Sequence, residues 1–367
     1  MFGRFVLRGV PVALLAVTLT SASATAATVP APAPVRIDKI AIPGKPLKAF
    51  DISWVDSASA KYYLANRSNG TIDVIDALTD SVVTQIGGFA GATGKNDTSG
   101  PDGVVTTISN KELWAGDGDS TVKVVDLVKD KVVATLSTGG KFRADEMAYD
   151  PKDNELIVAN NADDPPFATI FSVGARTVLK KIPFPNATNG AEQPQYDMVT
   201  GMFYLSVPAS VANPGGEIAV IDPVGLGVTA TYGLKNCGPN GLAIGPANQL
   251  LAGCGNPGRS VIIDRTNGAL LADFSNVGGS DEVWFNPGDN RYYLASSATQ
   301  NLGVIDALSL TLVTNAQGGI GSHSVAADMG SNHIFVPIAA PDPSCPNGCI
   351  AVYATPNLDM KGKSRLL

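Results

Sequence analysis

Histidine is scarce in this sequence, with only His323 and His333 among 367 residues. This scarcity excludes a zinc or copper site built from several histidines. No Cys-x-x-Cys-His haem-attachment motif occurs. The stretch "GATGKN" (91–96) ends like a phosphate-binding loop, but it lacks the glycine five residues before Gly94 and the Ser or Thr after Lys95. We therefore expect neither haem nor a bound nucleotide as cofactor.

Charge is also sparse, because charged residues make up 16% of the chain and the formal net charge is −7. An acidic protein of this kind is a poor partner for nucleic acid or for an anionic membrane surface. The longest apolar run, from Val10 to about Leu19, is too short to span a bilayer. We expect no nucleic-acid partner and no membrane span.

That apolar run belongs to a predicted targeting segment at the N-terminus. Arg4 and Arg8 precede it, and small residues in the pattern Ala-x-Ala follow it. This order of basic, apolar and small residues is typical of a secretory signal peptide. The sequence thus predicts an exported protein, periplasmic or secreted, whose net charge falls from −7 to −9 when cleavage removes the two arginines. The expected boundaries are 1–27 for the signal peptide, 28–35 for a linker, 36–355 for a single domain and 356–367 for a C-terminal tail.

Only four cysteines occur, which fits export to an oxidising compartment. Cys237 and Cys254 flank a predicted hairpin, whereas Cys345 and Cys349 bracket the turn signal "PNG". Of the three possible pairings, we favour disulfides 237–254 and 345–349. The rival interpretation, a metal site at Cys-x3-Cys, is a weak zinc pattern because no histidine lies nearby.

Short β-type segments are abundant, and they repeat. Gly and Pro punctuate runs rich in Val, Thr and Asn, which predicts many short strands and turns. One strand type recurs seven times, and a second type such as "TIDVID" (71–76) follows each copy. The seven copies of the first type are "YYLAN" (62–66), "LWAGD" (113–117), "LIVAN" (156–160), "FYLSV" (203–207), "LLAGC" (250–254), "YYLAS" (292–296) and "IFVPI" (334–338).

The repeating unit holds four short strands and recurs about every 40–50 residues, the spacing of a β-propeller blade. Seven units are visible, but the seventh lacks its fourth strand after Tyr353, and "VRIDKIAI" (35–42) supplies a spare strand before the first unit. We predict an all-β, seven-bladed β-propeller with four-stranded blades, in which this N-terminal strand completes the last blade. Such closure of the ring removes an exposed sheet edge.

The segments "YYLAN…TIDVIDALTDSVVTQI" and "YYLAS…LGVIDALSLTLVTNA" resemble the YVTN repeats of seven-bladed propellers, which are typically exported bacterial proteins. The resemblance covers about residues 36–355. It implies a fold rather than a function, since propellers of this kind include lactonases, lyases and non-catalytic binding modules. Irregular insertions, which often build a binding face, occur at 88–100, 185–192, 208–216 and 339–348.

Alignment of the seven units places a polar residue just before the first strand of every blade. The first strand is the innermost of a blade, so these residues should surround one mouth of the central channel. Five of the seven are carboxylates. We call this set the mouth ring, and its members are Asp51, Asp102, Asp145, Glu192, Asn240, Asp281 and His323.

The carboxylates of the mouth ring suggest a cation site. Five acids that converge on one mouth repel one another, and a bound cation would relieve the repulsion. Asp, Glu and Asn oxygens suit a hard ion, Ca²⁺ or Mg²⁺. A solvated rim whose acids cap loops is the open alternative. The predicted metal ligands are Asp51, Asp102, Asp145, Glu192, Asn240 and Asp281.

Two functions stay open at this point. In the first, the protein is a monomeric binding module whose acidic mouth takes up a cation, a small molecule or a basic peptide segment. In the second, it is a metal-assisted hydrolase or lyase acting on a lactone or ester, because calcium in a propeller channel resembles the six-bladed gluconolactonase- and paraoxonase-like hydrolases. The metal would then polarise a carbonyl or activate a water, with His323, Glu146 or Glu282 as the proton-transfer residue.

A second polar position, five residues after the mouth ring, is interpreted as turn chemistry, because Asp, Asn, Thr and Gly at a strand end bond their own backbone. Trp54 and Trp284 lie in first strands and either pack between blades or line the channel. His333 is expected at the surface. The members of this far column are Asp56, Thr107, Asp150, Asp197, Gly245, Asn286 and Asp328.

Overall fold

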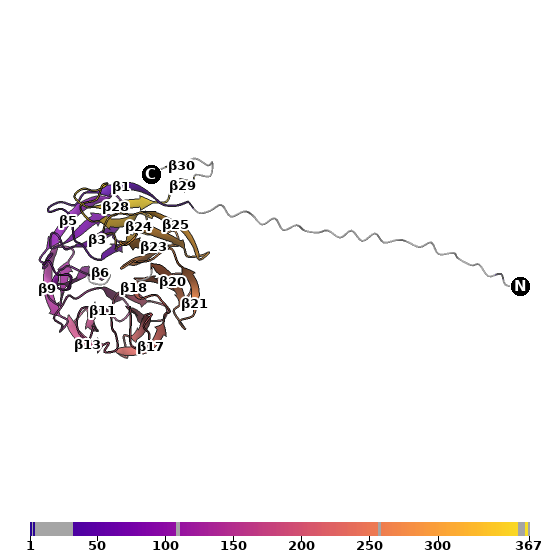
Figure 1. Ribbon diagram of the computed structural model, residues 1–367, viewed down its shortest axis with the longest axis horizontal. Helices are drawn as coiled ribbons and strands as arrows, with labels where there is room; N and C mark the ends of the chain where they lie inside the picture. The colour runs from indigo at the N-terminus through magenta and orange to yellow at the C-terminus, as the bar shows by residue number, and fades with distance from the viewer. Residues whose placement is uncertain (2, 4–31, 108–110, 256–257, 359–363, 366–367) are drawn as a thin grey trace. The chain divides into compact units, whose positions relative to one another are not determined.

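The computed structural model describes residues 1, 3, 32–107, 111–255, 258–358 and 364–365. The chain divides into two units, 1–31 and 32–367. The first contains the predicted signal peptide, 1–27, which lies almost entirely outside the described residues. The second contains seven four-stranded antiparallel sheets arranged as a ring (Figure 1), so the prediction of an all-β, seven-bladed propeller is confirmed.

The first four blades follow one another along the chain, and in each the strands run in sequence order from the channel outward. Blade 1 comprises β2 (Ser53–Asp56), β3 (Lys61–Asn66), β4 (Thr71–Asp76) and β5 (Ser81–Gly87). Blade 2 comprises β6 (Val104–Thr107), β7 (Glu112–Asp117), β8 (Thr121–Asp126) and β9 (Lys131–Ser137). Blade 3 comprises β10 (Met147–Asp150), β11 (Glu155–Asn160), β12 (Phe167–Ser172) and β13 (Thr177–Pro183). Blade 4 comprises β14 (Pro194–Asp197), β15 (Met202–Val207), β16 (Glu217–Asp222) and β17 (Gly227–Gly233).

The last three blades complete the ring. Blade 5 comprises β18 (Pro239–Ile244), β19 (Gln249–Cys254), β20 (Arg259–Asp264) and β21 (Leu270–Phe274). Blade 6 comprises β22 (Val283–Asn286), β23 (Arg291–Ser296), β24 (Asn301–Asp306) and β25 (Thr311–Gln317). Blade 7 comprises β26 (Ala326–Ala327), β27 (Ile334–Ile338), β28 (Cys349–Ala354) and β1 (Val35–Ile40). Outside the blades lie the 3-10 helix η1 (Asn96–Thr98) and the pair β29 (Asn357–Leu358) and β30 (Ser364–Arg365).

The N-terminal strand closes the ring as predicted. β1 pairs antiparallel with β28, with Arg36 opposite Tyr353 and Ile40 opposite Ile350. Ile40 is buried in the same apolar cluster as Ile350, while the rest of β1 is largely exposed. The two ends of the domain are therefore joined by backbone hydrogen bonds within the last blade, and the chain that follows β1 leads directly into the first blade.

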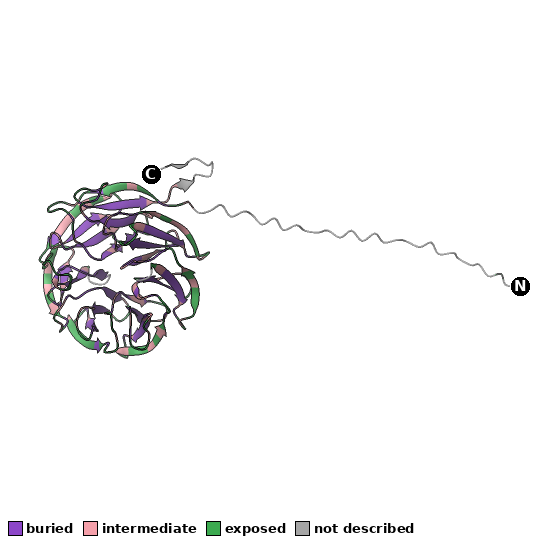
Figure 2. Cartoon of the chain, in the orientation of Figure 1, coloured by how far each residue is buried: buried purple, intermediate pink, exposed green. Residues whose placement is uncertain are grey.

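The core lies between neighbouring blades rather than within one layer. Tyr63 and Ala65 of blade 1, for example, pack in one cluster with Leu113 and Ala115 of blade 2. The two middle strands of each blade are apolar on both faces because one face packs against the preceding blade and the other against the following blade. The outermost strands are exposed, as the green rim in Figure 2 shows. Among the described residues, none of the helical segments has the length and apolar character of a membrane span.

Turn chemistry sets the ends of the strands. Asp76 Oδ1 accepts hydrogen bonds from the backbone N–H groups of Leu78 and Thr79. In the far column, Asp56 Oδ1 accepts from the N–H of Ala58 at 3.1 Å, and corresponding bonds are made by Asp150, Asp197, Asn286 and Asp328. The interpretation of these residues as turn formers is therefore confirmed.

Both predicted disulfides are present. Cys237 and Cys254 are bonded, as are Cys345 and Cys349. The first joins the loop before β18 to the end of β19, and the second spans the turn that leads into β28. No free cysteine is left to bind a metal.

Candidate functional site

In the first four blades, the backbone of the mouth-ring residue extends the hydrogen bonding between the first and second strands. The Asp51 N–H donates to Ala65 O at 2.9 Å, and the Asp145 N–H donates to Ala159 O at 2.8 Å. Asp102 and Glu192 make the same bond to the second strand of their own blades. This repeated bond places the mouth-ring residues of blades 1 to 4 at the same height along the channel.

An arginine that the alignment did not single out joins two members of the ring. Arg67 follows β3 and is buried, with a relative exposure of 6%. Its Nη2 lies 2.6 Å from Asp51 Oδ2, and its Nε lies 2.9 Å from Asp102 Oδ1. The remaining nitrogen, Nη1, donates to Asn96 Oδ1 at 2.8 Å. Arg67 thus holds blades 1 and 2 together at the channel mouth.

A second arginine, Arg143, occupies the third blade. Its Nε donates to Asp145 Oδ2 at 2.8 Å, while Nη1 lies 4.0 Å from the exposed Asp97 and makes no hydrogen bond. Each of the first three mouth-ring acids is therefore paired with a guanidinium group. Coulombic attraction to these two cations replaces part of the hydration that the buried acids lose.

The clustered charges shift the pKa values in opposite directions. Burial would raise the pKa of Asp51, but the Arg67 guanidinium holds it well below its usual range. Burial and the negative charge of Asp51 raise the pKa of Asp102 well above its usual value. Burial also raises the pKa of Asp145 to about 6, although Arg143 opposes the shift. The first half of the ring therefore shares two permanent cations among three carboxyl groups.

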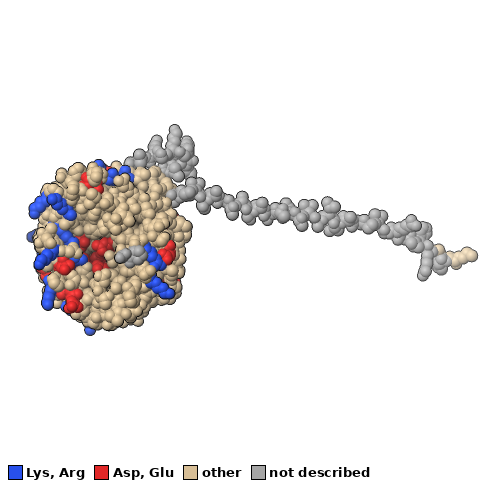
Figure 3. All heavy atoms as spheres, viewed as in Figure 1, with Lys and Arg blue, Asp and Glu red and all other residues tan. Residues whose placement is uncertain are grey.

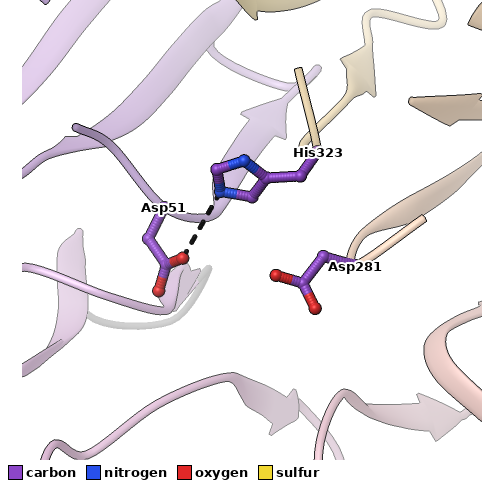
Figure 4. Close-up of side chains that lie close together, drawn as sticks. All are labelled: Asp51, Asp281 and His323. Carbon is purple, nitrogen blue, oxygen red and sulfur yellow. Dashed lines mark ion pairs between the residues drawn. The ribbon is translucent and has the colours of Figure 1, made fainter. Parts of the chain in front are cut away.

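His323 and Asp281 stand on the other side of the mouth and share Asp51 as a neighbour (Figure 4). His323 Nε2 lies 3.5 Å from Asp51 Oδ1, and ligand atoms of Asp51, Asp281 and His323 all lie within 4.8 Å of one another. The imidazole stacks on Phe50 at 4.8 Å between ring centroids, and its Nδ1 lies 2.7 Å from Gly321 O. Because a carbonyl oxygen can only accept, Nδ1 carries a proton, and Nε2 is the nitrogen directed at the two acids.

The ring is completed by Glu192 and Asn240, whose contacts are weaker. Glu192 Oε2 accepts from Asn161 at 3.1 Å, and Asn240 Nδ2 lies 3.5 Å from Asp281 Oδ1. Burial, together with the charges of Asp145 and Asp281, raises the pKa of Glu192 to about 8. All seven members of the mouth ring thus lie at the predicted mouth.

The two glutamates that follow ring members differ in their contacts. Glu282 Oε2 accepts hydrogen bonds from the backbone N–H groups of Ser53 and Val325 and from the Ser324 hydroxyl, which ties blades 1, 6 and 7 together. Glu146 is also buried, but its Oε2 has no hydrogen-bond partner. Burial and the nearby Asp281 raise the pKa of Glu146 well above its usual value.

A pocket of about 420 Å³ opens at this mouth. Its walls include Arg67 and Arg143 on one side and Asp281 and His323 on the other, with Asp51 between them. Acidic side chains also gather near the middle of the face drawn in Figure 3. The site is therefore a polar cavity of mixed charge, whose walls include two carboxyl groups, two guanidinium groups and the imidazole of His323.

The two arginines leave a signal in the sequence that a wider alignment would have found. Arg67 is the residue directly after the second strand of its blade, and the other blades have small or uncharged residues there. Arg143 stands two residues before its ring member. The counterparts of Arg67 are Gly118, Asn161, Pro208, Gly255, Ser297 and Ala339, and those of Arg143 are Ala49, Gly100, Gly190, Gly238, Gly279 and Gly321.

Two other expectations concern residues away from this mouth. Trp54 and Trp284 line the channel, but they do so around a separate pocket at the far-column end of the first strands. His333, expected at the surface, is half-buried, and its Nδ1 lies 3.0 Å from Asp80 Oδ1. Neither tryptophan contributes to the mouth-ring pocket.

Comparison with known proteins supports the fold alone. The structure is similar to that of Kuenenia stuttgartiensis hydrazine synthase, with a TM-score of 0.66 over 83% of this chain and 94% of that chain, at 13% sequence identity. At this identity the likeness carries no functional information. No protein-family model matches the chain, and no curated protein matches its sequence. The resemblance to YVTN repeats therefore stays a prediction.

Proposed function

We propose that the protein is an exported binding module whose channel mouth takes up a divalent cation through Asp51, Asp281 and His323. The observation that carries this proposal is the grouping of one imidazole nitrogen and two carboxyl groups within 4.8 Å at the wall of an open pocket. An ion at the centre of this group could reach all three donors with small side-chain movements.

The tautomer of His323 supports the same role. Nδ1 is engaged with Gly321 O at 2.7 Å, which leaves Nε2 to face the acids. Histidine ligands to metals are commonly oriented in this way, with the second nitrogen donating to a backbone carbonyl. The stacking contact with Phe50 further limits rotation of the ring.

The uneven distribution of cations around the ring favours this side of the mouth. Arg67 and Arg143 already pair with Asp51, Asp102 and Asp145, whereas Asp281 has no Lys or Arg partner among the described residues. The acids predicted as ligands therefore divide into a half paired with arginine and a half open to an added cation. We place the ion between Asp51, at the edge of the paired half, and Asp281 and His323 of the open half. Glu192 and Asn240 are the neighbouring oxygen donors.

The proposed ligands are compatible with more than one divalent cation. Carboxylate and amide oxygens are typical ligands of Ca²⁺ and Mg²⁺, our first candidates. An imidazole beside two carboxylates also suits Mn²⁺ or Zn²⁺. Each ion should therefore be tested separately on protein first stripped with a chelator.

A saturating divalent cation should raise the melting temperature of the stripped protein. An ion at 100 times its Kd stabilises the folded state by about 2.7 kcal/mol, which corresponds to roughly 5 °C for a domain of this size. Asp281→Asn should abolish the shift, because it removes a charged ligand at nearly constant shape. Differential scanning calorimetry of both proteins, with and without each ion, measures the effect.

Asp102→Asn is the matched control, since Asp102 belongs to the half of the ring that is paired with Arg67. This variant should keep the shift. A shift lost in Asp102→Asn but retained in Asp281→Asn would place the ion among Asp51, Asp102 and Asp145, and so contradict the proposed site. Absence of any shift with all four ions would refute cation binding.

The position of Glu146 supports a second candidate function, that of a metal-assisted hydrolase or lyase. Its carboxyl group is buried beside the ring and has an oxygen without a hydrogen-bond partner, as a proton-transfer residue awaiting a substrate would. A screen of lactones and esters with the cation-loaded protein tests this idea. Turnover that is lost in Glu146→Gln would support it, and turnover that is absent from the wild type would favour the binding module.

A further inference from the structure

The opposite end of the channel contains a second pocket, of about 320 Å³, with a different chemical character. Five aromatic side chains from four blades contribute to its walls. Trp54 and Trp284 meet edge to face, with their ring centroids 5.2 Å apart. Small-molecule sites are commonly concave, of this size or larger, and rich in aromatic side chains. The five aromatic residues are Trp54, Tyr149, Tyr196, Trp284 and Phe285.

The surroundings of this far pocket are acidic. Asp56 belongs to its wall, and Asp150 and Asp328 are each flanked in the sequence by two residues that line it. No Lys or Arg is among the described residues that line the pocket. Lys61, which is opposite Asp56 in the strand pairing, binds Asp76, and Arg265 binds Asp197.

Two of these acids also have oxygen atoms without a partner. Asp150 Oδ2 and Asp328 Oδ1 are buried and make no hydrogen bond, although the other oxygen of each carboxyl group caps a turn. Buried carboxyl oxygens that are not satisfied within the chain leave negative potential next to the aromatic walls. That potential adds to the negative faces of the aromatic rings.

We propose that this far pocket binds a small organic ammonium ion. Aromatic faces attract such a cation through the ring quadrupole, most strongly for Trp, and nearby carboxylates add a coulombic attraction. A compact alkylammonium fits the volume better than a peptide segment does. Met198 and Met329, which are exposed at the rim, are flexible enough to pack against its methyl groups.

Tryptophan fluorescence can test the proposal directly. The chain has three tryptophans, of which Trp54 and Trp284 line the far pocket and Trp114 is fully buried elsewhere. Choline should change the emission in a saturable way. The neutral isostere 3,3-dimethylbutan-1-ol has the same shape without the charge and should bind at least about tenfold more weakly. Equal or tighter binding of the alcohol, or no saturable change with choline, would overturn the proposal.

Variants separate binding from folding. Asp56→Asn preserves a side chain able to cap the turn but removes the charge, and it should weaken choline binding several-fold. Trp54→Leu should weaken binding about tenfold, with emission of Trp284 as the readout. Asp281→Asn, at the other mouth, should leave choline affinity unchanged. Choline affinity that falls in Asp281→Asn and stays constant in Asp56→Asn would contradict a site at the far pocket.

Discussion

Arg67→Met should lower the free energy of unfolding at pH 7 by about 3–5 kcal/mol, because it leaves the buried Asp51 without its cation. Methionine preserves much of the side-chain length, so the loss of charge and of three nitrogen donors is the main change. Asp102 loses the same partner. Urea denaturation in the presence of a chelator measures the effect without a contribution from bound metal.

The destabilisation should depend on pH. Arg67 holds the pKa of Asp51 below its usual value, so this pair stabilises the native wild type above about pH 4 and loses its effect as the pH falls further. In the variant, burial still raises the pKa of Asp51, and Arg67 no longer opposes this shift. Asp51 is therefore protonated at a higher pH than in the wild type. The difference in stability between the two proteins should therefore narrow between pH 7 and pH 3.5.

An exposed ion pair provides the control for this prediction. Lys129 pairs with Asp126 on the surface, and its side chain is 59% exposed. Lys129→Met should leave stability almost unchanged, since solvent screens such pairs. If Arg67→Met were as stable as Lys129→Met, the guanidinium would not be neutralising buried charge, and our description of the mouth ring would be wrong.

Deletion of β1 should open the ring. A chain that starts at Pro43 loses all pairing with β28 and the burial of Ile37 and Ile40. We expect a loss of about 5 kcal/mol, from roughly 1–3 kcal/mol for each apolar side chain together with the backbone ladder. The uncovered edge of β28 should also promote self-association. Calorimetry and light scattering, against a chain that starts at Pro32, measure both effects.

A synthetic peptide of residues 32–42 provides the matched test. Added in trans, it should restore the monomer and raise the melting temperature, whereas a scrambled peptide of the same composition should do neither. A monomeric deletion variant with unchanged stability would contradict the role of β1 in closure.

The number of blades and the closure of the ring by an N-terminal strand were predictable, because both depend only on the spacing and the number of the repeated strands. Seven copies of one strand type define seven blades, and the missing strand after Tyr353 requires a partner from elsewhere in the chain. Strand limits were less predictable. The closing strand ends at Ile40 rather than at residue 42, and β26 has only two residues. The end of a strand depends on its hydrogen bonds to the neighbouring strand. The order of residue types along the sequence does not specify these bonds.

The place of the mouth ring was predictable, but its electrostatics were not. Six of the seven ring members precede a first strand and Asn240 is the second residue of β18, so the repeat itself places them at one mouth. The ion pairs depend on Arg67 and Arg143, and each of these residues has uncharged counterparts in the other six blades. Because neither arginine recurs, the repeat pattern does not indicate it. For the same reason, the inter-blade hydrogen bonds of Glu282 required the relative positions of Ser53 and Ser324.

Pulsed electron paramagnetic resonance of the protein loaded with Mn²⁺ tests the central claim most directly. Mn²⁺ accepts the same carboxylate and imidazole donors, and the untagged chain has only two histidines, His323 and His333. We predict stoichiometric Mn²⁺ with coupling to one imidazole nitrogen, which disappears in His323→Gln and persists in His333→Gln. Bound Mn²⁺ without nitrogen coupling, or coupling that survives in His323→Gln, would contradict a cation site formed by Asp51, Asp281 and His323.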